Sequence, residues 1–164
     1  MSTSPPGPAP APNAPAGVAS GTPAPNAPAG AASGVERVNP PELARPSGFS
    51  HAVVAPGGRV VYLAGQTGLD ASGTVVPGGI VAQFEQALGN LLTALRAAGG
   101  TPDQLTQVRI YIVDMDTYRQ HAAEIGAVWR RLAGRDYPAM AGIGVPRLWD
   151  PEALVELEAT AHLP

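Results

Sequence analysis

Five short stretches rich in apolar residues predict five β-strands, and apolar and polar side chains alternate along two of them, residues 105–113 and 154–161. In chain order the strands cover residues 49–54, 60–66, 105–113, 139–146 and 154–161. The turn sequence Pro56-Gly57-Gly58 separates the first two strands and predicts that they form a hairpin.

Apolar side chains at three- and four-residue intervals predict two helices. The first covers Ile80–Leu95 and ends at Gly99-Gly100. The second begins after an N-cap at Asp114 or Asp116 and ends at Gly134. Each helix presents one apolar side, so each needs a sheet or another helix to cover that side.

The predicted order is β-β-α-β-α-β-β, which indicates an α+β domain of two layers with both helices on one face of a mixed sheet. The chain supplies no element to cover the other face. Because the last strand carries polar residues on that side, the face is either in contact with water or packed in an oligomer. The periodicity alone does not choose between these two arrangements.

The amino-terminal segment has a different composition from the rest of the chain. Residues 1–34 carry no charged side chain, and the sequence of residues 11–21 recurs almost unchanged at 24–34. Such a segment has too little apolar surface to offset the entropy lost on ordering. We therefore predict a disordered arm rich in Pro, Ala and Gly at 1–34, followed by one domain at 35–164.

The overall composition excludes several classes of function. The 164 residues include no cysteine, which excludes disulfides, thiolate chemistry and Cys-ligated metals, and no metal or cofactor is expected. A net charge of −3 with scattered charges provides no basic stripe for nucleic acid. Without a secretory signal or a membrane-spanning stretch, we predict a cytoplasmic protein that binds neither membrane nor nucleic acid.

The last two predicted strands carry the candidate chemistry. Glu156 and Glu158 share one strand face, where carboxylates at i and i+2 lie about 7 Å apart. If this strand lies beside Gly142 and Gly144, a carboxylate there would be partly desolvated and its pKa raised towards that of a general base. The alternative is a polar strand face in water.

Several motifs in sequence order resemble the Rid family (RidA, also called YjgF) over about residues 43–162. They are Ala64-Gly65-Gln66, Asn90 in the first helix, Tyr137-Pro138-Ala139, and the final Val155-Glu156-Leu157-Glu158-Ala159. The resemblance implies a chorismate-mutase-like α+β subunit. It also implies a homotrimer with its sheets inward, its helices outward and its pockets between subunits.

The resemblance further implies a cofactor-independent hydrolysis of reactive enamines and imines to a keto acid and ammonia. In this family a glutamate on the last strand positions or activates the attacking water, and that position is Glu156 in this sequence. The arginine that clamps a substrate carboxylate falls on Met140, a pocket serine falls on Ala64, and a pocket tyrosine falls on Phe49. The resemblance therefore implies a divergent member of the family.

These departures predict a small-molecule hydrolase that prefers neutral or apolar imines to carboxylate-bearing 2-imino acids, unless Arg147 or Arg109 replaces the missing arginine. Glu156 is the predicted catalytic residue. The predicted substrate-binding residues are Phe49, Ala64, Gly65, Asn90, Met140, Gly142 and Arg147. The alternative is a non-catalytic homotrimer that binds a metabolite or a partner protein.

Overall fold

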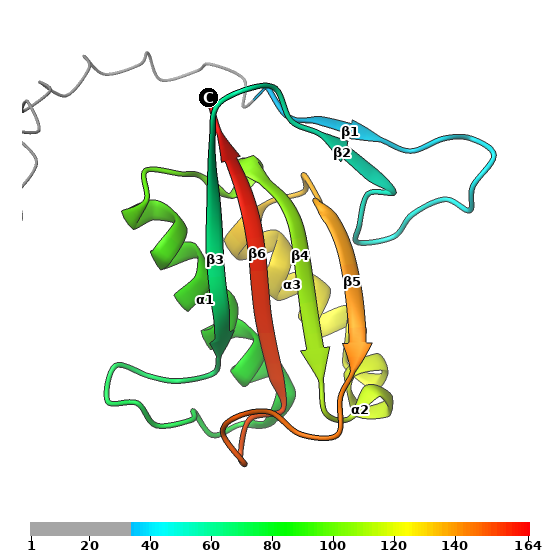
Figure 1. The fold of residues 1–164 in the computed structure, drawn as a ribbon. Coiled ribbons are helices and arrows are strands. Elements are labelled where there is room, and N and C mark those ends of the chain that lie inside the picture. Colours follow the sequence, from blue (N-terminus) through cyan, green and yellow to red (C-terminus); the bar gives the residue numbers. More distant parts are fainter. Residues whose placement is uncertain (1–33) are drawn as a thin grey trace, which may run out of the picture. The chain divides into compact units, whose positions relative to one another are not determined.

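A four-stranded mixed sheet forms the centre of the computed structural model, which describes residues 34–164. The predicted arm at 1–34 lies outside these residues, apart from its last position. Strand order in the sheet is β3 (Arg59–Thr67), β6 (Val155–Leu163), β4 (Leu105–Ile112) and β5 (Ala139–Gly144). β6 pairs antiparallel with both β3 and β4, whereas β4 and β5 are parallel (Figure 1).

The helices lie together on one face of this sheet, as predicted (Figure 1). α1 (Gly79–Ala97) packs against β3, β6 and α3 (Ala122–Ala133). The short α2 (Met115–Gln120) precedes α3, and a single 3-10 turn at Pro102–Gln104 precedes β4. The domain is therefore the expected two-layer α+β fold.

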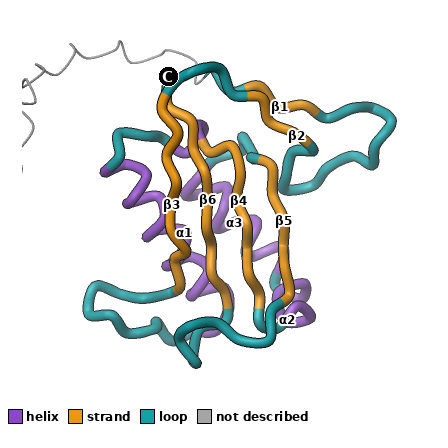
Figure 2. Tube along the Cα trace, viewed as in Figure 1, coloured by secondary structure: helices purple, strands orange, loops and turns teal. Residues whose placement is uncertain are grey.

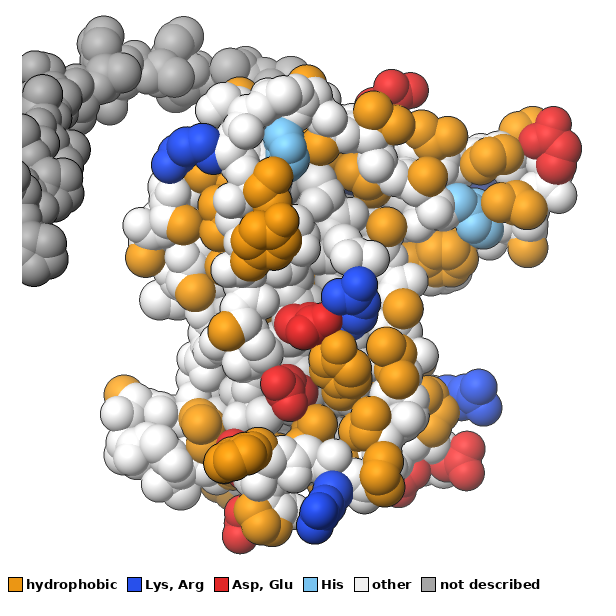
Figure 3. Space-filling view, viewed as in Figure 1, with side chains coloured by type: hydrophobic (Ala, Val, Ile, Leu, Met, Phe, Trp, Pro, Cys, Tyr) orange, Lys and Arg blue, Asp and Glu red, His pale blue; other side chains and the backbone are white. Residues whose placement is uncertain are grey.

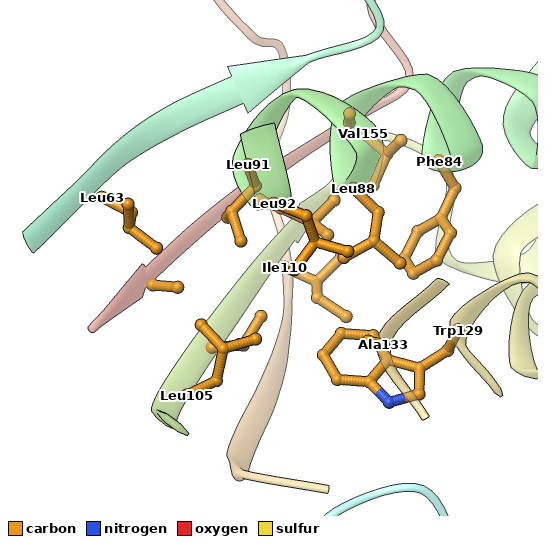
Figure 4. Close-up of a cluster of buried hydrophobic side chains, with 14 of the residues drawn as sticks. Leu63, Phe84, Leu88, Leu91, Leu92, Leu105, Ile110, Trp129, Ala133 and Val155 are labelled. Atoms are coloured by element: carbon orange, nitrogen blue, oxygen red, sulfur yellow. The ribbon is translucent and has the colours of Figure 1, made fainter. Parts of the chain in front are cut away.

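The core lies between the helices and the inner face of the sheet (Figure 4). On α1, Leu88, Leu91 and Leu95 are fully buried because their spacing places them on one side of the helix. On β6, burial alternates strictly, with Val155 and Leu157 inside. Each buried leucine or valine contributes about 1.5–3 kcal/mol, so this interface holds the two layers together.

The predicted hairpin between 49–54 and 60–66 is wrong. β2 (Ala52–Val54) pairs with β1 (Glu36–Val38) in a separate two-stranded ribbon (Figure 2), and β3 pairs with β6 instead. β3 buries Leu63 by lying beside the central strand, and this burial outweighs the local turn signal. β1 has only three residues, too few for an alternation that would have predicted it.

The second predicted helix is interrupted. His121 separates α2 from α3, because its dihedral angles of φ −98° and ψ 13° lie outside the helical region. The predicted N-cap is confirmed, since Asp114 accepts a hydrogen bond from the backbone N–H of Thr117 at 3.0 Å.

Candidate functional site

The face of the sheet that the helices leave open carries the polar side chains of β4 and β6. Because alternate residues of each strand enter the core, Arg109, Tyr111, Glu156 and Glu158 all point to the open face. Figure 3 views this face and shows acidic and basic side chains together near its middle. This group of four residues is the candidate site.

Glu158 is held by two donors from β4. Arg109 Nη1 lies 2.7 Å from Glu158 Oε1, and the Tyr111 hydroxyl donates to the same oxygen at 2.9 Å. The hydrogen bond from Arg109, followed by that from Tyr111, lowers the pKa of Glu158. The hydrogen bond that Tyr111 donates to Glu158 raises the pKa of the Tyr111 hydroxyl. Glu158 is thus fixed as an ionised acceptor and is unsuited to carrying protons.

Glu156 has a contrasting environment. Burial raises the pKa of its carboxyl group, and the charges of Glu158 and Asp150 raise it further. A Cβ added at Gly65 would overlap Oε1 of Glu156, so the carboxylate lies directly against the Gly65 backbone. Gly65 belongs to an irregularity in the pairing of β3 with β6, between Leu63 and Gln66. A half-buried carboxyl group of this kind can accept and return a proton.

Three neighbours of Glu156 were not predicted from the sequence. Thr67 and Tyr111 are its register partners on β3 and β4, and Thr67 Oγ1 donates to Asp150 Oδ2 at 3.2 Å. Strand alternation was a usable signal for Tyr111, which shares a face with Arg109. Asp150 lies in the loop between β5 and β6, where the sequence provides no comparable signal.

Two amide side chains of α1 fix the segments that lead to Glu156. Asn90 Nδ2 donates to the carbonyls of Thr67 at 3.3 Å and Leu69 at 2.8 Å. Gln83 Nε2 donates to the carbonyl of Glu152 at 3.1 Å. The Asn90 amide therefore holds the chain that follows β3, and its role in substrate binding stays a prediction.

Met140 and Gly142 lie on the other side of the sheet from Glu156. Met140 packs against the core, and a Cβ at Gly142 would lie 3.4 Å from Ile112 Cδ1. In addition, β4 lies between β5 and β6. Within this chain, the prediction that Gly142 and Gly144 lie beside the carboxylates is therefore wrong.

The remaining predicted residues lie in three places. Phe49 and Met140 line a shallow pocket of about 160 Å³ at the β5 edge. Ala64 is exposed on β3 beside Gly65. Arg147 is exposed in the loop between β5 and β6, where it lines a surface hollow with Trp149. The structure thus brings Ala64, Gly65 and Glu156 together and leaves Phe49 and Met140 at a separate edge.

Neither a metal-binding group nor a membrane-spanning helix is found among residues 34–164. Within residues 34–164, no group of three histidine or acidic side chains is placed to hold a metal ion. No helix in the same range has the length and apolar character needed to cross a bilayer.

Comparison with known proteins identifies the family. The sequence profile of the family described as endoribonuclease L-PSP matches residues 39–163. A solved structure from Yersinia pestis, described as a conserved Rid protein family member of unknown function, is 40% identical; it covers 79% of this chain and 99% of its own, with a TM-score of 0.70. The chain belongs to the Rid (YjgF) family.

Curated relatives extend this assignment. The RutC family protein UK114 of Drosophila melanogaster is 33% identical over 114 residues, which is 69% of this chain and 78% of the fly protein. The 2-iminobutanoate/2-iminopropanoate deaminase of Capra hircus is 32% identical over 114 residues, with the same shares of the two chains. The Rid family therefore includes imine deaminases among the relatives of this chain.

Proposed function

We propose that this Rid-family protein hydrolyses a small enamine or imine and releases ammonia, with Glu156 as its acid–base group. The observation that carries the proposal is the half-buried Glu156 carboxyl, which lies against Gly65 and whose pKa is raised by burial. The goat relative named as an imine deaminase supports the reaction class.

The chemistry requires one group that both gives and accepts a proton. Protonated Glu156 would give a proton to the enamine carbon, which produces an iminium ion. Ionised Glu156 would then accept a proton from water as the water oxygen attacks the C=N carbon, and would return that proton to the departing nitrogen. As ammonia leaves, Glu156 would take the remaining hydroxyl proton, so the carbonyl forms and Glu156 is protonated again. The net change is imine plus water to carbonyl plus ammonia, so no cofactor is needed.

The proposed substrate is neutral or apolar at the position where the family binds a carboxylate. Met140 stands in place of the arginine, and the guanidinium of Arg109 is already bound to Glu158 at 2.7 Å. A substrate carboxylate without a charge-assisted partner loses about 1.5–3 kcal/mol of binding. We therefore expect a neutral imine to react faster than a 2-imino acid of equal size.

The proposed assembly is a homotrimer with the pockets between subunits. Tyr62 on the open sheet face is 82% exposed and Val60 is 44% exposed, so apolar surface on this face lacks a cover within one subunit. The Met140 edge and Glu156 also lie apart in one subunit, and a second copy is needed to bring them together. A trimer would have a mass of about 50 kDa in light scattering, three times the 16.6 kDa of one chain.

The decisive experiment measures ammonia release from imines generated in place, with neutral and carboxylate-bearing substrates side by side. We expect Glu156→Gln to lower the rate about 100-fold or more. Glu158→Gln is the comparison on the same strand face. It should cause a much smaller loss, since it removes only a neighbouring charge that raises the pKa of Glu156 and it retains an oxygen acceptor for Arg109. Equal rates for Glu156→Gln and the wild type would refute the role of Glu156.

A second candidate function is a non-catalytic homotrimer that binds a metabolite or a partner protein. The observation that favours it is the same loss of the arginine at Met140, which is compatible with abandoned chemistry. It predicts a ligand that raises the melting temperature without ammonia release. RNA is disfavoured as that ligand, because the described open face around Glu156 carries two carboxylates and a paired Arg109 instead of a basic track.

A further inference from the structure

A second pocket lies on the helix-covered side of β5, behind the open face that carries Glu156. Its volume is about 460 Å³, and it is formed between β5, α2 and α3. The floor consists of large apolar and aromatic side chains from several elements, which are Phe84, Ile110, Tyr118, Trp129 and Met140. The volume falls in the range of about 300–1,000 Å³ typical of small-molecule sites.

The mouth of the pocket lies along α3, where the lining residues Ala122 and Ala123 are very small and exposed. Gly126 also lines it. A glycine inside a helix costs about 0.5–1 kcal/mol relative to alanine. At Gly126 the missing side chain leaves room for Arg130, whose Nη1 lies 3.3 Å from the place a Cβ would occupy. The guanidinium thus folds back along α3 towards the mouth.

Arg130 supplies the only charge among the residues that line this pocket. Within residues 34–164 it takes part in no ion pair, whereas the adjacent Arg131 binds Glu85 at 2.7 Å. Burial raises the pKa of the Tyr118 hydroxyl to about 12, so the pocket contains no competing anion at neutral pH. An unpaired guanidinium beside an apolar cavity is suited to a planar monoanion.

We propose that this pocket binds a small carboxylic acid with an aromatic or branched apolar body, its carboxylate on Arg130 and its body against Trp129 and Met140. A guanidinium matches a carboxylate through two parallel N–H···O bonds, which favours this anion over a neutral isostere. The inference goes beyond the proposed deamination, because Glu156 faces the opposite side of the sheet in the same subunit.

The probe is phenylacetate, and its neutral match is phenylacetamide, which has nearly the same shape. Trp149 is 94% exposed and would obscure the signal. In a Trp149→Phe background, the fluorescence comes from Trp129 in the wall of the pocket. We expect saturable binding of phenylacetate, with a Kd at least tenfold lower than that of phenylacetamide. Isothermal titration calorimetry with the full chain checks the same values.

Three variants locate the site. Arg130→Gln should weaken phenylacetate binding about tenfold or more and leave phenylacetamide unchanged. Arg131→Gln is the matched control and should change neither, because Arg131 is directed to Glu85. Ala123→Leu fills the mouth and should abolish the binding of both compounds, while its circular dichroism and melting curve confirm that it folds.

Several outcomes would overturn the proposal. They are the absence of phenylacetate binding at millimolar concentration, equal affinity of Arg130→Gln and the starting protein, and undiminished binding to a folded Ala123→Leu variant. Glu156→Gln should bind phenylacetate normally, so a failure of the proposed deamination leaves this result interpretable. If Arg130→Gln is unstable, Arg130→Lys replaces it and should show a smaller loss of affinity, since it keeps the charge without the planar fork.

Discussion

Gly65→Ala tests whether the contact between β3 and Glu156 positions the candidate acid–base group. An added Cβ would overlap Glu156 Oε1 and would lie 2.8 Å from Cδ and 3.3 Å from Cγ. Carbon atoms pack best at about 3.5–4.0 Å, so the carboxyl carbon must move away by about 0.7–1.2 Å. The alanine methyl group therefore displaces the carboxylate.

The expected effects follow from that displacement. A misplacement of about 1 Å at a catalytic group costs up to about 100-fold in rate, so we expect ammonia release to fall about 10- to 100-fold. For stability, the overlap costs about 1–3 kcal/mol, and the lower entropy of the unfolded alanine chain offsets about 0.4–1 kcal/mol of that cost. The free energy of unfolding should therefore fall by about 1 kcal/mol.

A double-mutant cycle with Glu156→Ala isolates the contact. Without the carboxylate, Gly65→Ala has nothing to displace and should stabilise the protein by about 0.4–1 kcal/mol in urea unfolding at pH 7. The coupling between the two positions should thus exceed 1 kcal/mol. If Gly65→Ala keeps full activity and its effect on stability is the same in both backgrounds, the carboxylate does not depend on the Gly65 backbone for its position.

Three further predictions concern stability. The pKa of Glu156 is higher in the folded state than its ordinary value of 4.5, so the folded state binds more protons there than the unfolded state. The free energy of unfolding should therefore fall as the pH rises from 4.5 through the folded pKa. Glu156→Gln should flatten this slope in urea unfolding between about pH 4 and 8. Arg109→Gln should raise the pKa of Glu158 in an NMR titration and should lower the free energy of unfolding by only about 0.2–1 kcal/mol, because the pair is partly exposed. An unchanged pKa would contradict the pairing of Arg109 with Glu158 at 2.7 Å. Trp129→Phe should lower the free energy of unfolding by less than the about 3–5 kcal/mol of a large-to-small core substitution, because it also removes the buried Trp129 Nε1, which has no hydrogen-bond partner within residues 34–164. A thermal melt that shows the full loss of about 3–5 kcal/mol would indicate that this N–H does have a partner.

The sequence was sufficient to predict those helices and strands that bury only one of their sides in the core. α1 and β6 show this most clearly, since the apolar positions of each are spaced to match its own geometry. The sharing of one face by Glu156 and Glu158 follows from the same rule. By contrast, the break at His121 has no signal in the spacing, because the apolar side of the helix continues beyond it.

Strand order was not predictable, because alternation assigns residues to a face without naming the neighbouring strand. Met140 and Gly142 do share a face, as their spacing requires. Only the position of β4 between β5 and β6 shows that this face is opposite to that of Glu156. The pocket beside Arg130 was missed for a similar reason, since it depends on how α3 and β5 meet in space.

The position of β4 also limits how the site can work. Neighbouring strands are about 4.8 Å apart, so Met140 and Glu156 belong to strands separated by about 10 Å and point to opposite faces. No change of side-chain rotamer brings these two positions together in one subunit. If Met140→Arg confers activity on 2-imino acids, the new guanidinium must therefore approach Glu156 of another copy. That gain of activity would support both the proposed trimer and the proposed reaction, because neither a monomeric site nor an abandoned one accounts for it.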